Sequence, residues 1–172
     1  MKINSVLINN YKGINASLGL NDGINVITGK NGTGKSNILE AIRVALGIEA
    51  PNKENIISGE KSVALIKVIL SEKMFLDKYS VLKKIYRSGE IKTYYNDSWP
   101  DNQIDCLLLD YDSHCFMNNE KLAEFALSLK EQAKTKQIII ISNSKEILDI
   151  ADCVLETSKI GNGYTLLKKA VA

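Results

Sequence analysis

Eight residues between two predicted secondary-structure elements constrain the fold of this chain more than any other feature. Residues 29–36 read Gly-Lys-Asn-Gly-Thr-Gly-Lys-Ser and match the pattern G-x-x-x-x-G-K-[ST]. The apolar residues 24–28 before the match predict a strand, and apolar side chains at helical spacing in residues 35–46 predict a helix that ends at Gly47. A strand, a glycine-rich turn and a helix in this order are typical of a phosphate-binding loop.

The residue types of this loop suit an anion. Glycine adopts backbone angles that are closed to other residues, so successive amides can turn towards a phosphate, and the helix N-terminus adds unpaired N–H groups. The pattern predicts that Lys35 reaches the β- and γ-phosphates and that Ser36 places its hydroxyl on Mg²⁺. The residues expected to hold the phosphates are Gly29, Lys30, Asn31, Gly32, Thr33, Gly34, Lys35 and Ser36.

The overall composition predicts one compact globular domain. The chain has 172 residues, of which 45% are hydrophobic and 24% are charged, and its net charge of +2 does not by itself identify a nucleic-acid partner. No apolar run approaches the roughly 20 residues that span a bilayer, so we expect no membrane contact and a cytoplasmic protein. Cys106, Cys115 and Cys153 do not form a metal-binding pattern with the single histidine, His114, and Cys106 and Cys153 lie in apolar runs that predict core positions.

The N-terminal part of the chain predicts mostly antiparallel strands. Alternating and β-branched residues indicate a strand pair, followed after the phosphate loop and its helix by a meander of three strands. No helical pattern separates the meander strands, so we expect them to form a sheet of their own. The expected strands are residues 2–9 and 14–20 for the pair, and 63–70, 79–87 and 91–95 for the meander.

The C-terminal part alternates strands and helices, which predicts parallel pairing. Residues 96–103 are polar and turn-rich and are expected to be a linker between an N-terminal lobe, 1–95, and a C-terminal lobe, 104–172, of one domain, 1–172. The expected elements are a strand at 104–110, an amphipathic helix at 119–134, a buried strand at 137–142, a short helix at 144–151, and terminal strands near 154–155 and 164–167.

One aspartate stands where a phosphate loop needs a second group to order Mg²⁺. Asp110 ends the apolar run at 106–110, and the carboxyl end of a neighbouring parallel strand faces the crevice in which the nucleotide lies. Ser36 and Asp110 are therefore the predicted metal ligands.

The whole order of elements resembles the head domain of the SMC, RecF, RecN and SbcC-type ABC ATPases. The resemblance rests on residues 6–13 at the start of the chain, on residues 29–37, on the meander, and on the strand ends at Asp110 and Asn143. It implies an α/β P-loop NTPase fold of the ABC-ATPase-head type, with a mostly parallel core sheet plus an antiparallel β meander. It also implies ATP and Mg²⁺ as cofactors.

The same resemblance adds three residues to the expected site. The family has a basic residue after an aromatic that touches the nucleotide, and Lys12 takes this role, with an ordinary solvated lysine as the alternative. Asn37 matches the asparagine that follows the family's phosphate loop. Gln103 matches the family's Mg²⁺-linked glutamine, and a plain linker residue is the alternative.

Other positions depart from the family pattern. The family's catalytic glutamate after the aspartate is replaced by Tyr111, and a phenol with a pKa of about 10 is a poor base at neutral pH. Asp112 is the nearby carboxylate that would substitute for it. The family's switch histidine is replaced by Asn143, and His114 is expected to be a surface or interface residue. The coiled coil and the signature motif are also missing from the sequence.

These observations lead to three functional hypotheses. The favoured one is an ATP·Mg-binding head with weak or absent hydrolysis, acting as a nucleotide-dependent module in DNA maintenance or repair and pairing as a homodimer or with a partner head. The second is an active ATPase completed by a partner chain or by Asp112. The third is a DNA-binding accessory protein with little nucleotide dependence, which uses a basic face on the meander made of Lys83, Lys84, Arg87 and Lys92.

Overall fold

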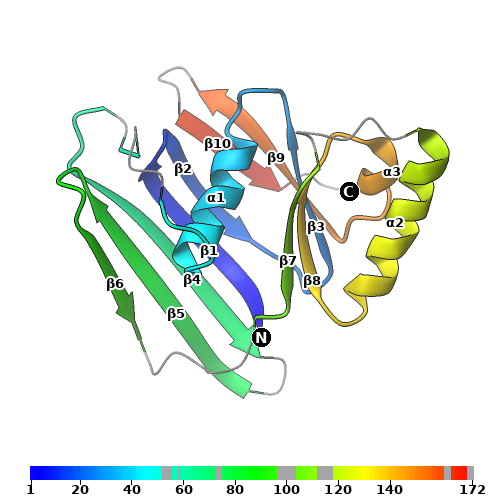
Figure 1. Cartoon of the computed structure of the whole chain (residues 1–172), viewed down its shortest axis with the longest axis horizontal. Helices are drawn as coiled ribbons and strands as arrows, with labels where there is room; N and C mark the ends of the chain where they lie inside the picture. Colours follow the sequence, from blue (N-terminus) through cyan, green and yellow to red (C-terminus); the bar gives the residue numbers. More distant parts are fainter. Residues whose placement is uncertain are drawn as a thin grey trace.

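The computed structural model of the chain describes residues 1–51, 56–57, 59–72, 75–96, 104–111, 118–160 and 164–169. The described strands form one sheet in the order β6-β5-β4-β1-β2-β10-β9-β3-β8-β7 (Figure 1). In chain order the elements are β1 (Lys2–Tyr11), β2 (Ile14–Gly19), β3 (Ile24–Gly29), α1 (Lys35–Ala45), β4 (Val63–Glu72), β5 (Phe75–Tyr86), β6 (Ile91–Tyr95), β7 (Cys106–Asp110), α2 (Asn119–Ala133), β8 (Gln137–Ile141), α3 (Lys145–Leu148), β9 (Cys153–Ile160) and β10 (Tyr164–Lys169).

The antiparallel half of the sheet contains the predicted strand pair and the predicted meander. β1 pairs with β2, β4 with β5, and β5 with β6, all antiparallel. The meander does not form a sheet of its own, however, because β4 also pairs with β1, with Val68 opposite Val6 and Ile66 opposite Ile8. The ten-residue β1 has two free edges, and the chain uses one for β2 and the other for β4, so the expectation of a separate sheet was wrong.

The parallel half of the sheet brings the strand ends of the predicted site together. β3 lies between β9 and β8, β7 lies next to β8, and all three pairings are parallel. Asp110 at the end of β7 is opposite Ile141 at the end of β8, and Ile141 is opposite Ile27 in β3. The carboxyl ends of β3, β7 and β8 therefore share one edge, as the alternation of strands and helices predicted.

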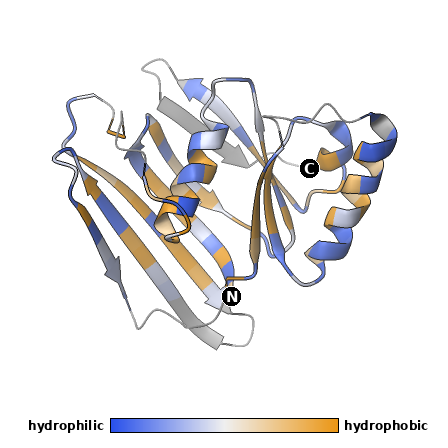
Figure 2. Ribbon diagram, viewed as in Figure 1, coloured by the Kyte–Doolittle hydropathy of each residue, from blue (hydrophilic) through white to orange (hydrophobic). Residues whose placement is uncertain are grey.

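Helices cover the two faces of the sheet unequally. α1 lies between the antiparallel and the parallel half (Figure 1) and contacts β1, β3, β4, β5 and β7. α2 and α3 pack on the other face of the parallel half, where Leu122, Leu129 and Ile147 join a cluster with residues of β3 and β8. Hydrophobic residues run along β4, β7 and β8, whereas hydrophobic and hydrophilic residues alternate around α2 (Figure 2).

The strand β8 shows why a continuous apolar run predicts a strand with both faces covered. Its isoleucines have no exposed surface, and successive side chains alternate between the two clusters. Ile139 and Ile141 pack with the residues of α1, and Ile138 and Ile140 pack with those of α2 and α3.

The helix α1 begins and ends at glycines, as predicted. Gly34 at its start has φ +96° and Gly47 just after its end has φ +77°, a region that favours glycine. The short helix expected at 144–151 is present as α3, although the Ser144 Oγ donates to Glu146 Oε2 at 2.7 Å instead of capping the backbone.

The cysteines and the helices can be compared with the expectations from composition. Cys153 is a buried core residue, as expected, whereas Cys106 is half-buried and packs against the core. Burial raises the pKa of the Cys106 thiol to about 12. Among the described residues, no helix combines the length and the apolar character needed to cross a membrane.

Candidate functional site

The phosphate loop lies between β3 and α1 and has the backbone that its glycines predict. Gly29 has φ +141°, Gly32 has φ +76° and Gly34 has φ +96°. Lys30, Asn31 and Gly32 form the exposed crest of the loop, and Lys35 already belongs to the first turn of the helix. The loop thus presents its amides and the N-terminus of α1 at the same edge of the sheet.

Gly29 has a second reason to be glycine, because β9 passes directly behind it. A Cβ at this position would lie 2.2 Å from Thr157 Oγ1 and 2.6 Å from the Thr157 carbonyl oxygen. Thr157 is 3% exposed, and its Oγ1 lies 2.6 Å from Thr33 Oγ1. This buried threonine packs against the loop, and it could not be predicted from the sequence because it lies 124 residues away from Thr33.

A cavity of about 370 Å³ opens above the loop. It is lined by Asn31, Gly32, Gly34, Lys35, Ser36, Asn37 and Asp110. The structure therefore brings most of the predicted phosphate-contacting residues together with the predicted strand-end aspartate. Thr33 is instead buried inside the loop, where its Oγ1 donates to the Lys30 carbonyl oxygen at 2.7 Å.

Lys35 is 6% exposed, and its ammonium contacts the backbone at the start of the phosphate loop. Its Nζ donates to the Gly29 carbonyl oxygen at 2.8 Å and lies 3.4 Å from that of Lys30. An ammonium held by neutral carbonyls can exchange them for a phosphate, which is a stronger partner because it is charged.

The side chains of Ser36 and Asp110, the two predicted metal ligands, contact each other at the cavity. Ser36 Oγ donates to Asp110 Oδ2 at 2.8 Å. Asp110 Oδ1 is buried and accepts no hydrogen bond from the residues that the structure describes, which is costly for a carboxylate oxygen. A hydroxyl and a carboxylate with a spare lone pair are the oxygen ligands that Mg²⁺ takes, so the donor set fits this ion.

The two residues that depart from the family pattern are used for other purposes. The Tyr111 ring stacks on Phe125 of α2, with centroids 5.3 Å apart and an angle of 16° between the rings. Asn143 Oδ1 accepts hydrogen bonds from Thr28 Oγ1 at 2.7 Å and from the Gly29 N–H at 3.1 Å. Tyr111 thus packs towards α2, and Asn143 ties the end of β8 to the start of the phosphate loop.

Lys12 lies on the turn between β1 and β2, beside α1. Its Nζ contacts both carboxylate oxygens of Glu40, at 2.6 and 2.7 Å, and Tyr11 Oη donates to the same carboxylate at 2.9 Å. Glu40 was not among the predicted site residues, although its position four residues after Ser36 places it on the same face of the helix.

Three of the residues whose role or position was predicted are not part of the described structure. Gln103, Asp112 and His114 lie outside the described residues.

The prediction of a basic face on the meander was wrong in part, because neighbouring residues of a strand point to opposite faces. Lys83 points to α1, where its Nζ donates to the Val44 carbonyl oxygen at 2.6 Å, and burial lowers its pKa.

The remaining basic residues of the meander split as well. Arg87 donates to the carbonyl oxygens of Gly59 and Lys61. Lys84 and Lys92 are opposite each other in the register of β5 and β6, where each ammonium lies over a tyrosine ring of the other strand.

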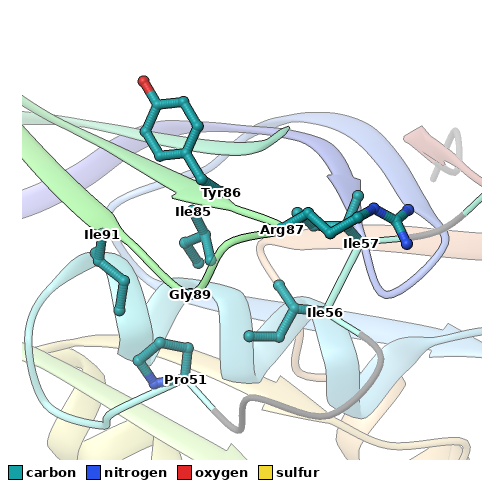
Figure 3. A pocket seen from close by; sticks show the side chains of 8 residues that line it. All are labelled: Pro51, Ile56, Ile57, Ile85, Tyr86, Arg87, Gly89 and Ile91. Carbon is teal, nitrogen blue, oxygen red and sulfur yellow. The ribbon is translucent and has the colours of Figure 1, made fainter. Parts of the chain in front are cut away.

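A second cavity, of about 210 Å³, lies between the segment after α1 and the β5–β6 hairpin (Figure 3). Pro51, Ile56, Ile85 and Ile91 gather around it, whereas the Tyr86 hydroxyl and the Arg87 guanidinium point away from them (Figure 3). The four apolar side chains offer no titratable group, whereas the cavity above the phosphate loop is lined by Lys35, Ser36 and Asp110.

Comparison with known proteins agrees with this geometry. The chain's structure is similar to the SMC head domain from Thermotoga maritima, with a TM-score of 0.81, 15% sequence identity and full coverage of both chains. It is also similar to an Smc head bound to the C-winged helix domain of ScpA, with a TM-score of 0.82, 13% identity, and 99% and 98% of the two chains covered.

A third similar structure is the Smc head domain with an extended coiled coil bound to the C-terminal domain of ScpA, derived from Pyrococcus furiosus. It has a TM-score of 0.79 and 11% identity over 98% of this chain and 96% of that one. These likenesses confirm the predicted fold of the SMC head type. No curated protein matches the sequence. The family model described as "AAA ATPase domain" matches residues 1–164, and the chain therefore belongs to this ATPase domain family.

Proposed function

We propose that this domain binds ATP with Mg²⁺ above the phosphate loop and hydrolyses it slowly or not at all. The observation that carries the proposal is the cavity in which the loop, Lys35 and the Ser36–Asp110 pair face one another. Ser36 and Asp110 would hold the ion, which would supply positive charge to the phosphate oxygens. Lys35 would exchange its carbonyl partners for the β- and γ-phosphates.

The arrangement of the same site supports the proposal of slow hydrolysis. A general base must lie within hydrogen-bond reach of the attacking water. Tyr111 takes the place of the family's glutamate and is stacked on Phe125, while the side-chain oxygen of Asn143 is engaged by Thr28 and Gly29. ATP would then act as a bound effector that stabilises one arrangement of the domain.

The first experiment is isothermal titration with ATP and Mg²⁺. Lys35→Ala should weaken binding by about 10- to 100-fold, since it removes a charge-assisted contact of about 1.5–3 kcal/mol. Lys134→Ala is the matched control, because this lysine lies just after α2 and is 67% exposed. Equal affinity of the wild type and Lys35→Ala would refute the proposal.

The alternative of an active ATPase, completed by a partner chain or by Asp112, predicts measurable turnover. Steady-state phosphate release is compared between the wild type and Asp112→Asn, alone and with DNA. A turnover number near those of ordinary ATPases that falls in Asp112→Asn would favour this alternative over slow hydrolysis.

Pairing with a second head and a role in DNA maintenance or repair are also part of the proposal, and the fold shared with Smc heads supports them. Two of those heads are bound to a domain of ScpA, so a protein partner of this kind is a further candidate. Light scattering with and without ATP tests pairing: a shift to twice the mass that Lys35→Ala abolishes would support it, and an unchanged mass would oppose it.

DNA binding with little nucleotide dependence is the weakest candidate. Lys84 and Lys92 share one face, but Lys83 and Arg87 are engaged with carbonyl oxygens elsewhere. A binding titration across salt concentrations distinguishes the cases, because each phosphate contact steepens the salt dependence.

A further inference from the structure

The turn between β1 and β2 is fastened to α1 by a single carboxylate. Glu40 accepts from the Lys12 ammonium with both oxygens and from the Tyr11 hydroxyl with Oε1. The side chains of Lys12 and Glu40 are 19% and 17% exposed. Water and salt therefore screen this pair less than they screen an exposed ion pair.

The backbone of the turn is distorted so that two neighbouring residues reach the same group. Side chains of successive strand residues point to opposite faces, but Tyr11 and Lys12 both contact Glu40. Lys12 does so with φ +46°, after Asn10 with φ +62°, and this region is unfavourable for residues that carry a Cβ. The Lys12 N–H also donates to the Ile56 carbonyl oxygen at 2.7 Å, which fixes the turn from its other side.

The position of Glu40 connects this turn with the phosphate cavity. Glu40 follows Ser36 by four residues and Asn37 by three, so the three side chains lie on one face of α1. Ser36 and Asn37 line the cavity, and a rise of about 6 Å over four residues separates Ser36 from Glu40 along the helix axis. Glu40, which holds the Lys12 ammonium, thus lies about one helical turn along α1 from two residues that line the cavity.

We propose that Glu40 is a positioning residue that competes with the nucleotide for Lys12: it holds the ammonium in the ligand-free protein and yields it to a nucleotide phosphate. This inference rests on the proposed function. Breaking the Lys12–Glu40 ion pair costs free energy, and this cost makes nucleotide binding less favourable. Glu40 therefore keeps the affinity for the nucleotide low, so that the bound nucleotide can exchange.

Tyr11 keeps the carboxylate in place during the exchange. Its ring is buried, and burial together with the hydrogen bond to Glu40 raises the pKa of the phenol far above its ordinary value. The phenol therefore stays a neutral donor at every physiological pH. Glu40 retains this hydrogen bond when Lys12 leaves, which limits the cost of the exchange.

The test is a titration with ATP and Mg²⁺ of the wild type, Glu40→Gln, Lys12→Met and the double variant. Glu40→Gln removes the charge but leaves an oxygen for the Tyr11 hydroxyl, and it should tighten ATP binding about fivefold. In the Lys12→Met background, Glu40→Gln should increase the affinity for ATP clearly less. There it relieves only the repulsion between the Glu40 carboxylate and the phosphates. Glu49→Gln is the matched control and should change the affinity less than twofold, because Glu49 acts on Tyr11 by its charge alone.

A second readout follows Lys12 itself. Labelling of amines, located by mass spectrometry, should increase at Lys12 in Glu40→Gln, and ATP should suppress this increase. A purely structural role of Glu40 predicts weaker ATP binding in Glu40→Gln and no protection of Lys12 by ATP.

The outcomes separate the two proposals. The competition would be refuted, and the proposed function would stand, in either of two cases. One is that Glu40→Gln increases the affinity for ATP equally with and without Lys12. The other is that ATP leaves the labelling of Lys12 in Glu40→Gln unchanged. Absence of ATP binding by the wild type would overturn the proposed function, and the competition with it.

Discussion

The two sides of the phosphate cavity differ in how closely they follow the ATPase pattern. On the loop side, Gly29, Gly34 and Lys35 have the conformations and burial that phosphate binding needs. On the strand-end side, Asp110 is in place, but Tyr111 is stacked on a helix and Asn143 is tied to the loop.

If the domain binds ATP as proposed, the difference means that the groups for holding a phosphate and those for activating water have separate structural requirements. The loop depends on backbone angles within a few residues, so a short stretch of sequence is enough to specify it. Water activation depends on single side chains at the ends of β7 and β8. Changing these side chains leaves the loop intact, and here they serve packing and tethering instead.

The largest expected effect tests the loop side. Gly29→Ala combines φ +141° with a Cβ 2.6 Å from the Thr157 carbonyl oxygen, so it should lower the free energy of unfolding by about 3–4 kcal/mol and abolish ATP binding. Urea unfolding measures the first effect and titration measures the second. Gly89→Ala is the control, since Gly89 has φ +88° but open space around it, and it should cost about 1–2 kcal/mol. Equal losses in the two variants would show that contact with β9 is unimportant.

A smaller effect is expected on the strand-end side. Tyr111→Ala removes the stack on Phe125 and should cost about 2 kcal/mol of stability, while the affinity for ATP stays within twofold of the wild type. Tyr94→Ala, at a residue 45% exposed in β6, should cost less than about 1 kcal/mol. A large loss of ATP affinity without loss of stability would place Tyr111 in the site and contradict the contrast between the two sides.

The smallest effect concerns the contact that joins the two sides. Asn143→Ala removes the acceptor of Thr28 Oγ1 and the Gly29 N–H, both of which water can reach, and should weaken ATP binding about fivefold, or about 1 kcal/mol. The neighbouring Ser144→Ala should leave the affinity unchanged, because the Ser144 hydroxyl donates to Glu146. Tighter binding by Asn143→Ala would mean that the asparagine restrains the loop instead of supporting it.

Much of the fold could be predicted from local patterns. Alternation and apolar runs placed β3, α1 and β8 within one or two residues of their observed bounds. The pairing of β4 with β1 could not be predicted in this way, because the choice between a separate sheet and an extended one depends on which strand edges the folded chain leaves free.

The sequence by itself determined the phosphate loop, its glycines, Lys35, Ser36 and the strand-end position of Asp110. These features depend on backbone conformation and on strand ends, which short stretches of sequence encode. The tertiary structure alone decided that Thr157 braces Gly29, that Glu40 holds Lys12, and that Tyr111 packs on α2. Each of these contacts joins residues from different elements. Such contacts cannot be predicted from spacing along the chain, because burial and charge pairing depend on distances in space.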